Sequence, residues 1–227
     1  MKIFSIICTR DKSLNPTTTK LVHTLSSYGV EVKVLANQNS IFEAYEKGLS
    51  LCDAGDKDII IFCHDDLDIG STRPEFIACL SYCLAEGVGI VGPAGTTCLG
   101  EDAVWWNQER WQAGYHRGSV DHHNKETNKK YTTHYGTYGQ VVVLDGLFLA
   151  AKKEVWDQVG LKKPSYFEGD WDFYDIHYTT TAHLLGLKNA TIPLHMIHYS
   201  SGELVGRDSW HKNREAYIKN TSLPISC

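Results

Sequence analysis

The sequence predicts an α/β domain with a mostly parallel central sheet flanked by helices. Two observations lead to this prediction. In the first ninety residues, short runs of β-branched and aromatic residues alternate with amphipathic segments of helical length. Polar and glycine residues separate these runs, as they do between strands and helices. Such alternation implies parallel strands joined by right-handed crossovers in a doubly wound sheet.

The individual elements follow from these patterns. Strands are expected at residues 3–8, 30–36, 59–62 and 88–91, and helices at 16–28, 41–52 and 74–84. Asn15 is the candidate N-cap of the first helix, Pro16 suits its first position, and Gly29 marks its end. The run 59–62 is continuously apolar, which is typical of a buried central strand.

The pattern breaks down between residues 92 and 139, where an irregular segment is expected. It is rich in aromatic and histidine side chains, which either stack on a sugar or base or cover the sheet: Trp105, Trp106, Trp111, Tyr115, His116, His122, His123 and His134. Regular structure is expected again as strands at 140–144, 147–151 and 191–199, and as helices at 153–159 and 178–185. A basic tail begins at Trp210.

Composition limits the class of protein. A length of 227 residues suits one large domain or two small ones, and a formal charge of −5 argues against a partner that is nucleic acid or a membrane surface. No apolar stretch approaches the ~18 residues of a membrane span, and no secretory signal is expected. The seven cysteines form no CxxC pair. We therefore expect a reduced, soluble, intracellular chain.

The most informative stretch is His64-Asp65-Asp66-Leu67-Asp68, directly after the run 59–62. Three carboxylates at the carboxyl end of a strand repel one another, and a hard divalent cation bound through oxygen resolves that repulsion. Open α/β sheets also bind ligands at this end of their strands. The alternative is an ordinary Asp-rich turn that leads into a helix. The cluster favours a metal site that holds a phosphate.

Taken in order along residues 3–200, the motifs resemble those of GT-A glycosyltransferases, specifically the family 2-like group that uses nucleotide sugars. In that family an Asp-x-Asp at a strand end holds Mn²⁺ or Mg²⁺ against the donor diphosphate. Asp66 and Asp68 fit this spacing as metal ligands. Asp65 would contact the nucleotide or support the turn. The leading His-Asp-Asp looks like a variant from small viral and bacterial members.

Two further segments carry the resemblance. Residues 143–160 are similar to the family's Asp-Gly segment, which implies that Asp145 contacts a sugar hydroxyl and that Gly146 lets the backbone approach the ligand. Residues 174–186 resemble the segment in which an aspartate opens a helix and acts as general base. Asp175 takes that position, and it could equally be a helix N-cap, while Asp172 and Asp170 are competitors. This sequence departs from the pattern at Tyr174 and His177, where the family has acids.

The remaining assignments rest on position. His198 stands where the family often supplies a further metal ligand, with His195 and His211 less favoured. Residues that follow the first two strands would contact the nucleotide: Thr9, Arg10, Asn37, Asn39 and Ser40. On this division, residues 1–92 form a nucleotide-binding half and residues 93–227 a sugar and acceptor half of one GT-A domain.

The resemblance implies a metal-dependent, inverting glycosyltransferase that moves a sugar from a nucleoside-diphosphate sugar to the hydroxyl of a glycan or glycoconjugate. One base and one metal on opposite sides of the anomeric carbon suit in-line displacement. UDP is the expected nucleotide, because UDP-sugars are the commonest donors in the family that the sequence resembles. The expected location is the cytoplasm, or the host cytoplasm for a viral protein. The alternatives are a sugar nucleotidyltransferase, whose Gly-rich loop is missing after residue 8, and a non-catalytic carbohydrate-binding protein.

Overall fold

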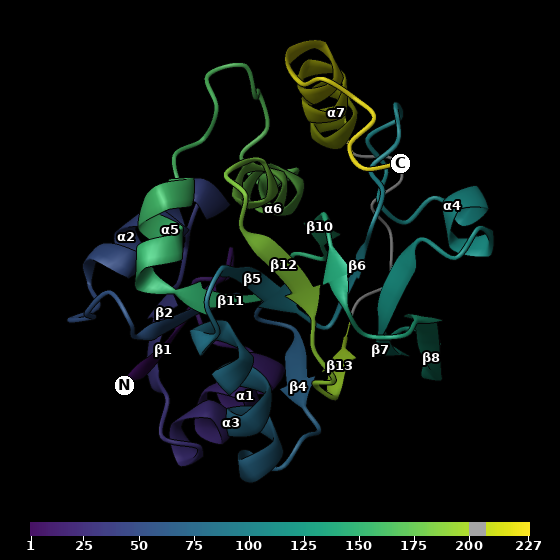
Figure 1. The fold of residues 1–227 in the computed structure, drawn as a ribbon. Coiled ribbons are helices and arrows are strands. Elements are labelled where there is room, and N and C mark those ends of the chain that lie inside the picture. Colours follow the sequence, from purple (N-terminus) through teal and green to yellow (C-terminus); the bar gives the residue numbers. More distant parts are fainter. Residues whose placement is uncertain (200–207) are drawn as a thin grey trace.

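The computed structural model describes residues 1–199 and 208–227, and a seven-stranded sheet within them forms the centre of the fold (Figure 1). Strands β1, β2 and β3 are parallel, as are β5 and β12, whereas β11 runs antiparallel between β3 and β5, and β9 runs antiparallel to β12. The order is β2 (Glu31–Leu35), β1 (Ile3–Cys8), β3 (Ile59–Cys63), β11 (Phe148–Lys152), β5 (Val88–Gly92), β12 (Lys188–Thr191) and β9 (Gln140–Val141). The predicted mostly parallel sheet is confirmed.

Helices cover both faces of this sheet. Figure 1 shows α1 and α3 below it and α2, α5 and α6 above it, with α7 on the outer side of α6. Their bounds are α1 Pro16–Ser27, α2 Ile41–Ser50, α3 Arg73–Ser81, α5 Lys153–Val159, α6 Tyr174–Leu184 and α7 Asp208–Asn220, and a 3-10 turn, Tyr82–Leu84, follows α3. Helix α1 starts where expected, since Asn15 accepts a hydrogen bond from the Thr18 amide at 2.9 Å.

Aromatic side chains fill the space between the sheet and the upper helices. Phe62 of β3 stacks on Tyr45 of α2 at 4.3 Å between ring centroids and meets Trp156 of α5 edge-on at 4.7 Å. The Trp156 indole donates to the Ile60 carbonyl at 3.1 Å, so its polar atom is satisfied inside the core. These contacts fix β3, which leads into the Asp cluster, against two helices.

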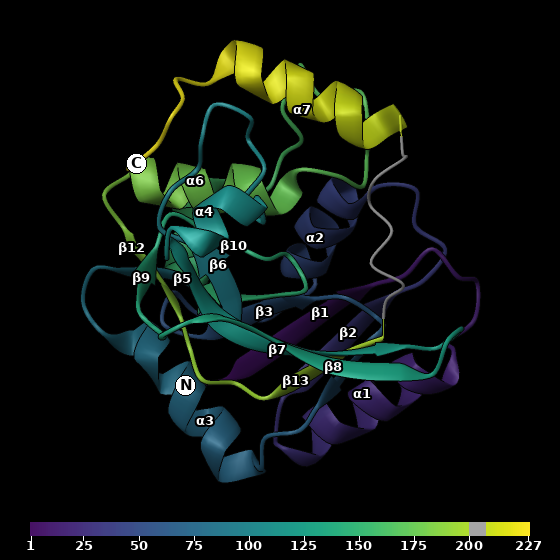
Figure 2. The same cartoon turned by 90° about the vertical axis from the view of Figure 1, so that its right-hand side faces the viewer.

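A second sheet occupies the region where an irregular segment was expected, and that expectation is wrong. Its order is β10 (Val143–Leu144), β6 (Ala94–Thr96), β7 (His116–Asn124), β13 (Met196–His198) and β4 (Leu67–Ile69), with β8 (Lys129–Gly136) on β7. Figure 2 shows the long β7–β8 hairpin running across the molecule. Strand β8 is mostly exposed and polar, so it lacks the apolar alternation by which a half-buried strand is recognised. Helix α4 (Gln108–Gln112) precedes the hairpin.

Several boundaries also differ from expectation. The strand expected at 191–199 is two strands, β12 and β13, in different sheets, and the run 140–144 is likewise divided between β9 and β10. Helix α6 begins at Tyr174, four residues early, and the basic tail forms α7. A disulfide joins Cys98 to Cys227, so a fully reduced chain is contradicted for this pair. Among the described residues, no helix is both long and apolar enough to cross a bilayer.

Asn189 ties three elements together inside the molecule. Its side chain is fully buried, accepts from the Ile90 amide at 3.0 Å, and donates to the carbonyls of Val142 at 3.0 Å and Thr179 at 2.7 Å. Val142 immediately precedes β10, and Thr179 lies on α6. The asparagine therefore fixes the segment before Asp145 relative to the helix that carries Asp175.

We expect Asn189→Ala to lower the free energy of unfolding by about 3 kcal/mol, because it leaves one amide and two carbonyls buried without partners. Asn220→Ala removes an exposed hydrogen bond to the Ala216 carbonyl and should change the free energy of unfolding by no more than about 0.5 kcal/mol. Urea unfolding of both variants measures the difference. Equal losses in the two variants would contradict the role given to Asn189.

Candidate active site

A cavity of about 600 Å³ opens where β1 and β3 end and where the chain enters β11 and α6. It collects side chains that are far apart in sequence. The polar side chains that line it are Thr9, Arg10, Asp11, His64, Asp65, Asp66, His122, Asp145, Asp172, Asp175 and His198. The aromatic side chains that line it are Trp105, Trp106, Tyr131, Tyr135, Trp171, Phe173, Tyr174 and Trp210. The location agrees with the rule that α/β sheets bind ligands at the carboxyl ends of their strands.

His64, Asp66 and His198 form a compact cluster in this cavity. One ligand atom from each lies within 4.8 Å of the others. The Oδ1 atom of Asp66 is 3.4 Å from His198 Nε2 and 3.8 Å from His64 Nδ1. This buried oxygen accepts no hydrogen bond from any described residue. A buried carboxylate oxygen that faces two imidazole nitrogens is suited to share a cation with them.

The electrostatics of the cluster show the same need for positive charge. Burial pushes the pKa of Asp66 upward, but attraction from His198 and then His64 outweighs it and lowers that pKa to about 2. Burial likewise opposes protonation of His198, yet the neighbouring Asp66 raises its pKa above the usual value. Metal ions bind neutral imidazole, so a cation that enters here would displace a proton.

The donor set fits a divalent transition metal. Imidazole nitrogens suit first-row transition metals, whose affinity series for nitrogen and oxygen sites begins with Mn²⁺, whereas Mg²⁺ prefers an all-oxygen shell. The cluster offers two nitrogens and one carboxylate. Of the two ions expected from sequence, Mn²⁺ therefore fits better than Mg²⁺. His64, which was absent from the expected ligand set, would supply the third ligand.

Asp68, expected as a ligand together with Asp66, lies outside this cluster and does not line the cavity. Its carboxylate pairs with Lys20 of α1 at 2.5 Å. The reason is strand alternation: in the β4–β13 pair Leu67 lies opposite His198, so these two point to one face and Asp68 points to the other. Asp66 lies in the bend that precedes β4 and Asp68 lies within the strand, so the i, i+2 spacing that puts two side chains on one face of a continuous strand does not do so here.

Asp145, Gly146 and Asp175 form a corner beside the cluster. The Gly146 amide donates to Asp175 Oδ2 at 3.3 Å, and the Leu147 amide donates to Asp145 Oδ1 at 3.2 Å. A Cβ on residue 146 would collide with Tyr174 and Asp175, so glycine is required here for close packing of the chain itself. Burial, and then the charge of Asp145, raises the pKa of Asp175 to about 7. Burial also raises the pKa of Asp145.

The competing acids differ in their surroundings. Asp172 is 4% exposed, and the Ser209 hydroxyl of α7 donates to its carboxylate at 2.7 Å. Asp170 pairs with Lys163 at 2.8 Å and does not line the cavity. Asp175 lies in the first turn of α6 rather than at its N-cap, which is Phe173. Of the three, Asp175 has the raised pKa that suits a general base near neutral pH.

The positions expected to bind nucleotide divide into two groups. Thr9 and Arg10 line the cavity, and the Arg10 guanidinium lies 4.1 Å above the centre of the Trp171 ring. Asp65 also lines it, and burial raises the pKa of this carboxyl. Asn37, Asn39 and Ser40 do not line it: the two asparagines are exposed, and Ser40 caps α2 by accepting from the Glu43 amide at 3.4 Å.

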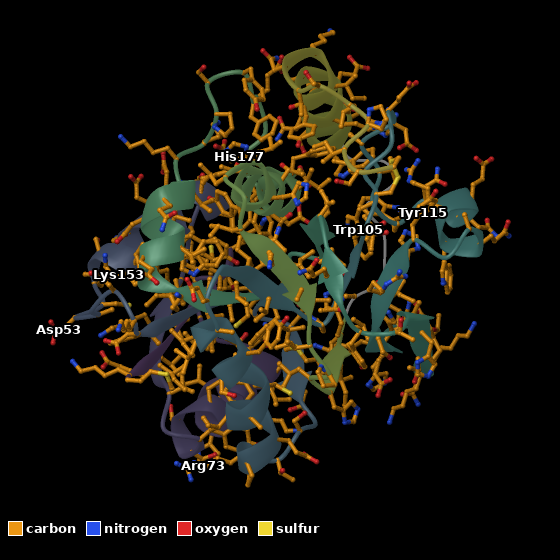
Figure 3. All side chains as sticks on the ribbon, viewed as in Figure 1. Asp53, Arg73, Trp105, Tyr115, Lys153 and His177 are labelled. Atoms are coloured by element: carbon orange, nitrogen blue, oxygen red, sulfur yellow. A yellow bond between two sulfur atoms is a disulfide. The ribbon has the colours of Figure 1, made fainter. Side chains whose placement is uncertain are left out.

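The side chains of the aromatic segment are divided between the cavity and the surface. Trp105 and Trp106 line the cavity, whereas Tyr115 and Trp111 are exposed outside it. Figure 3 shows Trp105 toward the interior and Tyr115 at the periphery beside α4. His116 is fully buried and hydrogen-bonds the Trp105 carbonyl, so it supports the cavity wall.

Of the histidines considered as ligands, His198 lies in the cluster and His195 pairs with Asp121 at 2.7 Å. His211 packs edge-on against Trp210 and does not line the cavity. The residues Ser200 to Gly202, whose position after His198 favoured that residue, lie outside the described part of the chain.

The comparisons with known proteins agree with this geometry. Residues 4–217 match the family model described as "Glycosyltransferase like family". The crystal structure of A197 from STIV is similar with a TM-score of 0.53 at 15% identity, over 88% of this chain and 87% of that chain. The crystal structure of GalNAc-T7 with UDP, GalNAc and Mn²⁺ is similar with a TM-score of 0.63 at 11% identity, over 95% of this chain and 47% of that chain. No curated protein matches the sequence. The predicted GT-A fold is confirmed.

The reassignment of the metal ligands can be tested with a matched pair of variants. We expect Asp66→Asn to weaken Mn²⁺ binding by more than about 100-fold, because it removes the only carboxylate among the cluster residues. Asp68→Asn should leave Mn²⁺ affinity unchanged, since it removes only the pairing of a buried carboxylate with the exposed Lys20, outside the cluster. Calorimetric titration with Mn²⁺ measures both. Loss of binding in the Asp68 variant with retention in the Asp66 variant would restore the Asp-x-Asp assignment.

Proposed function

The chain belongs to the glycosyltransferase-like family whose model it matches, and from this premise we propose that it is a metal-dependent, inverting enzyme. It would transfer a sugar from a nucleoside-diphosphate sugar to the hydroxyl of a glycan or glycoconjugate. The observation that carries the proposal is the single cavity in which the His64–Asp66–His198 cluster lies beside the Asp145–Asp175 corner. One part suits a diphosphate held through a cation, and the other suits removal of a proton.

The donor end of the cavity is defined by the cluster and by the residues after β1. His64, Asp66 and His198 would hold the cation, which when bound offsets the charge that develops on the departing diphosphate. Thr9, Asp65 and the Arg10–Trp171 pair offer hydrogen bonds, charge and an aromatic face to the nucleotide. Uridine is the proposed base on family frequency, and the similar GalNAc-T7 structure contains UDP and Mn²⁺.

The acceptor end is defined by Asp175. Its carboxylate would take the proton of the acceptor hydroxyl as that oxygen attacks the anomeric carbon, and a single displacement of this kind inverts the configuration. Asp145 lies close enough to raise the pKa of Asp175 and is placed to accept from a sugar hydroxyl. Trp106 and Trp210, which pack together at 5.7 Å between centroids, supply an apolar wall for the acceptor.

Nucleotide binding provides the most direct test of the donor assignment. At a UDP concentration about 100 times its Kd, with Mn²⁺ present, the stability of the protein should rise by about 2.7 kcal/mol, seen as a higher melting temperature. Asp66→Asn should abolish the part of this shift that depends on Mn²⁺. If no nucleoside diphosphate stabilises the protein with any metal, the transferase proposal fails. A glycan that stabilises it equally with and without nucleotide would indicate a carbohydrate-binding protein.

Asp175→Asn should reduce turnover by about 10²- to 10⁴-fold and leave the nucleotide-induced thermal shift unchanged, because it removes only the base. In the wild type, kcat/KM should rise with pH and level off above a midpoint at about 7, since a carboxyl with a raised pKa accepts a proton only once ionised. A bound cation would move this midpoint down. Asp172→Asn should reduce turnover less, and its kcat/KM should still fall as the pH drops below about 7. The reverse ranking would make Asp172 the base.

A further inference from the structure

Tyr174 links the two halves of the proposed site through one hydroxyl. It is the first residue of α6, and its side chain is 5% exposed. The hydroxyl donates to the Gly146 carbonyl at 3.0 Å and lies 2.7 Å from His64 Nε2. It stands where the family resemblance leads one to expect an acid, so the resemblance assigns it no role.

The direction of these two hydrogen bonds follows from counting protons. A tyrosine hydroxyl has a single hydrogen, and a backbone carbonyl can only accept. Both contacts can be hydrogen bonds at once only if Tyr174 donates to Gly146 and accepts from His64, which places the hydrogen of that ring on Nε2. In the neutral ring Nδ1 then carries the lone pair that can ligate a metal. That atom lies 3.8 Å from Asp66 Oδ1.

We propose that Tyr174 is a positioning residue that holds His64 in the Nε2–H form and thereby presents Nδ1 to the cation of the cluster. The inference rests on the proposed function, because it concerns the same metal site. The Nδ1 atom lies on the side of Asp66 Oδ1, and both belong to the cluster whose ligand atoms lie close enough to hold one cation. The same hydroxyl donates to the carbonyl of Gly146, whose amide donates to Asp175. One side chain therefore contacts both the cluster and the Asp145–Asp175 corner.

The surroundings of Tyr174 keep this hydroxyl in place. Its ring meets Phe42 edge-on at 6.4 Å and Tyr45 at 5.8 Å, which leaves no room for another rotamer. The absence of a side chain at Gly146 makes the space that the hydroxyl occupies. Burial raises the pKa of Tyr174 well above its usual value, so the hydroxyl keeps the hydrogen that it donates.

Tyr174→Phe removes the hydroxyl and keeps the ring. We expect it to weaken Mn²⁺ binding by about 10- to 100-fold, the usual effect of losing the outer partner of a histidine ligand. Tyr178→Phe is the matched control: Tyr178 lies one turn later on α6, is fully buried, and donates to the Leu161 carbonyl at 2.8 Å, outside the cavity. It should lose similar stability and retain wild-type Mn²⁺ affinity. Calorimetry and thermal melting of both variants measure the two effects separately.

A second measurement reports on the ring itself. Long-range ¹H–¹⁵N spectra of the metal-free wild type should show the His64 ring in the Nε2–H form. The His64 signal is identified by its absence from the spectrum of His64→Asn. In Tyr174→Phe, the same signal should show a mixture of the two tautomers. The double variant should bind Mn²⁺ no more weakly than His64→Asn alone, because Tyr174 acts through His64. Equal Mn²⁺ affinity in wild type and Tyr174→Phe overturns this inference alone. A wild type that binds no Mn²⁺ overturns the proposed metal site together with it.

Discussion

The buried carboxylate of Asp66 has to be balanced by positive charge, and much of the arrangement around the cavity depends on this requirement. An ionised carboxylate is stable inside a protein only when it is paired. Here the balance comes from His64 and His198, which lie on different sheets, since His64 follows β3 and His198 belongs to β13. The second sheet is therefore part of the chemistry of the site, because β13 carries one of the two partners.

The reversed direction of β11 explains why Asp145 and Gly146, which precede a strand, lie in the same cavity as residues that follow β1 and β3. In an all-parallel sheet, residues at the amino end of a strand lie at the edge opposite the binding site. Strand β11 runs antiparallel to β3, so Gly146 and Leu147 reach the carboxyl end of β3, and the His64 amide donates to the Leu147 carbonyl at 3.0 Å. This one reversal brings Asp145 next to the His64–Asp66–His198 cluster without a long loop.

The sequence predicts the parts of this site that depend on local patterns. The apolar run before Asp66 and the capping asparagine of α1 are such patterns, and both strand and helix lie where expected. The partners of Asp66 and Asp68 depend instead on where β4 begins, since Asp66 lies in the bend before the strand and Asp68 within it, and β4 pairs with β13, about 130 residues away. The contact of His64 with Tyr174, 110 residues away, likewise cannot be read from spacing in the sequence, whereas the Ser40 cap of α2 is a local contact with Glu43.

Two carboxylates in one cavity have been given opposite properties by their neighbours. Asp66 faces two imidazoles and has a pKa of about 2, so it stays charged whatever the pH of the cell. Asp175 is half-buried beside Asp145, and its pKa of about 7 lets it exchange a proton near neutrality. Environments that push the pKa values of neighbouring acids apart assign them different roles. Asp145 contributes to this division, since its charge adds to burial in raising the pKa of Asp175.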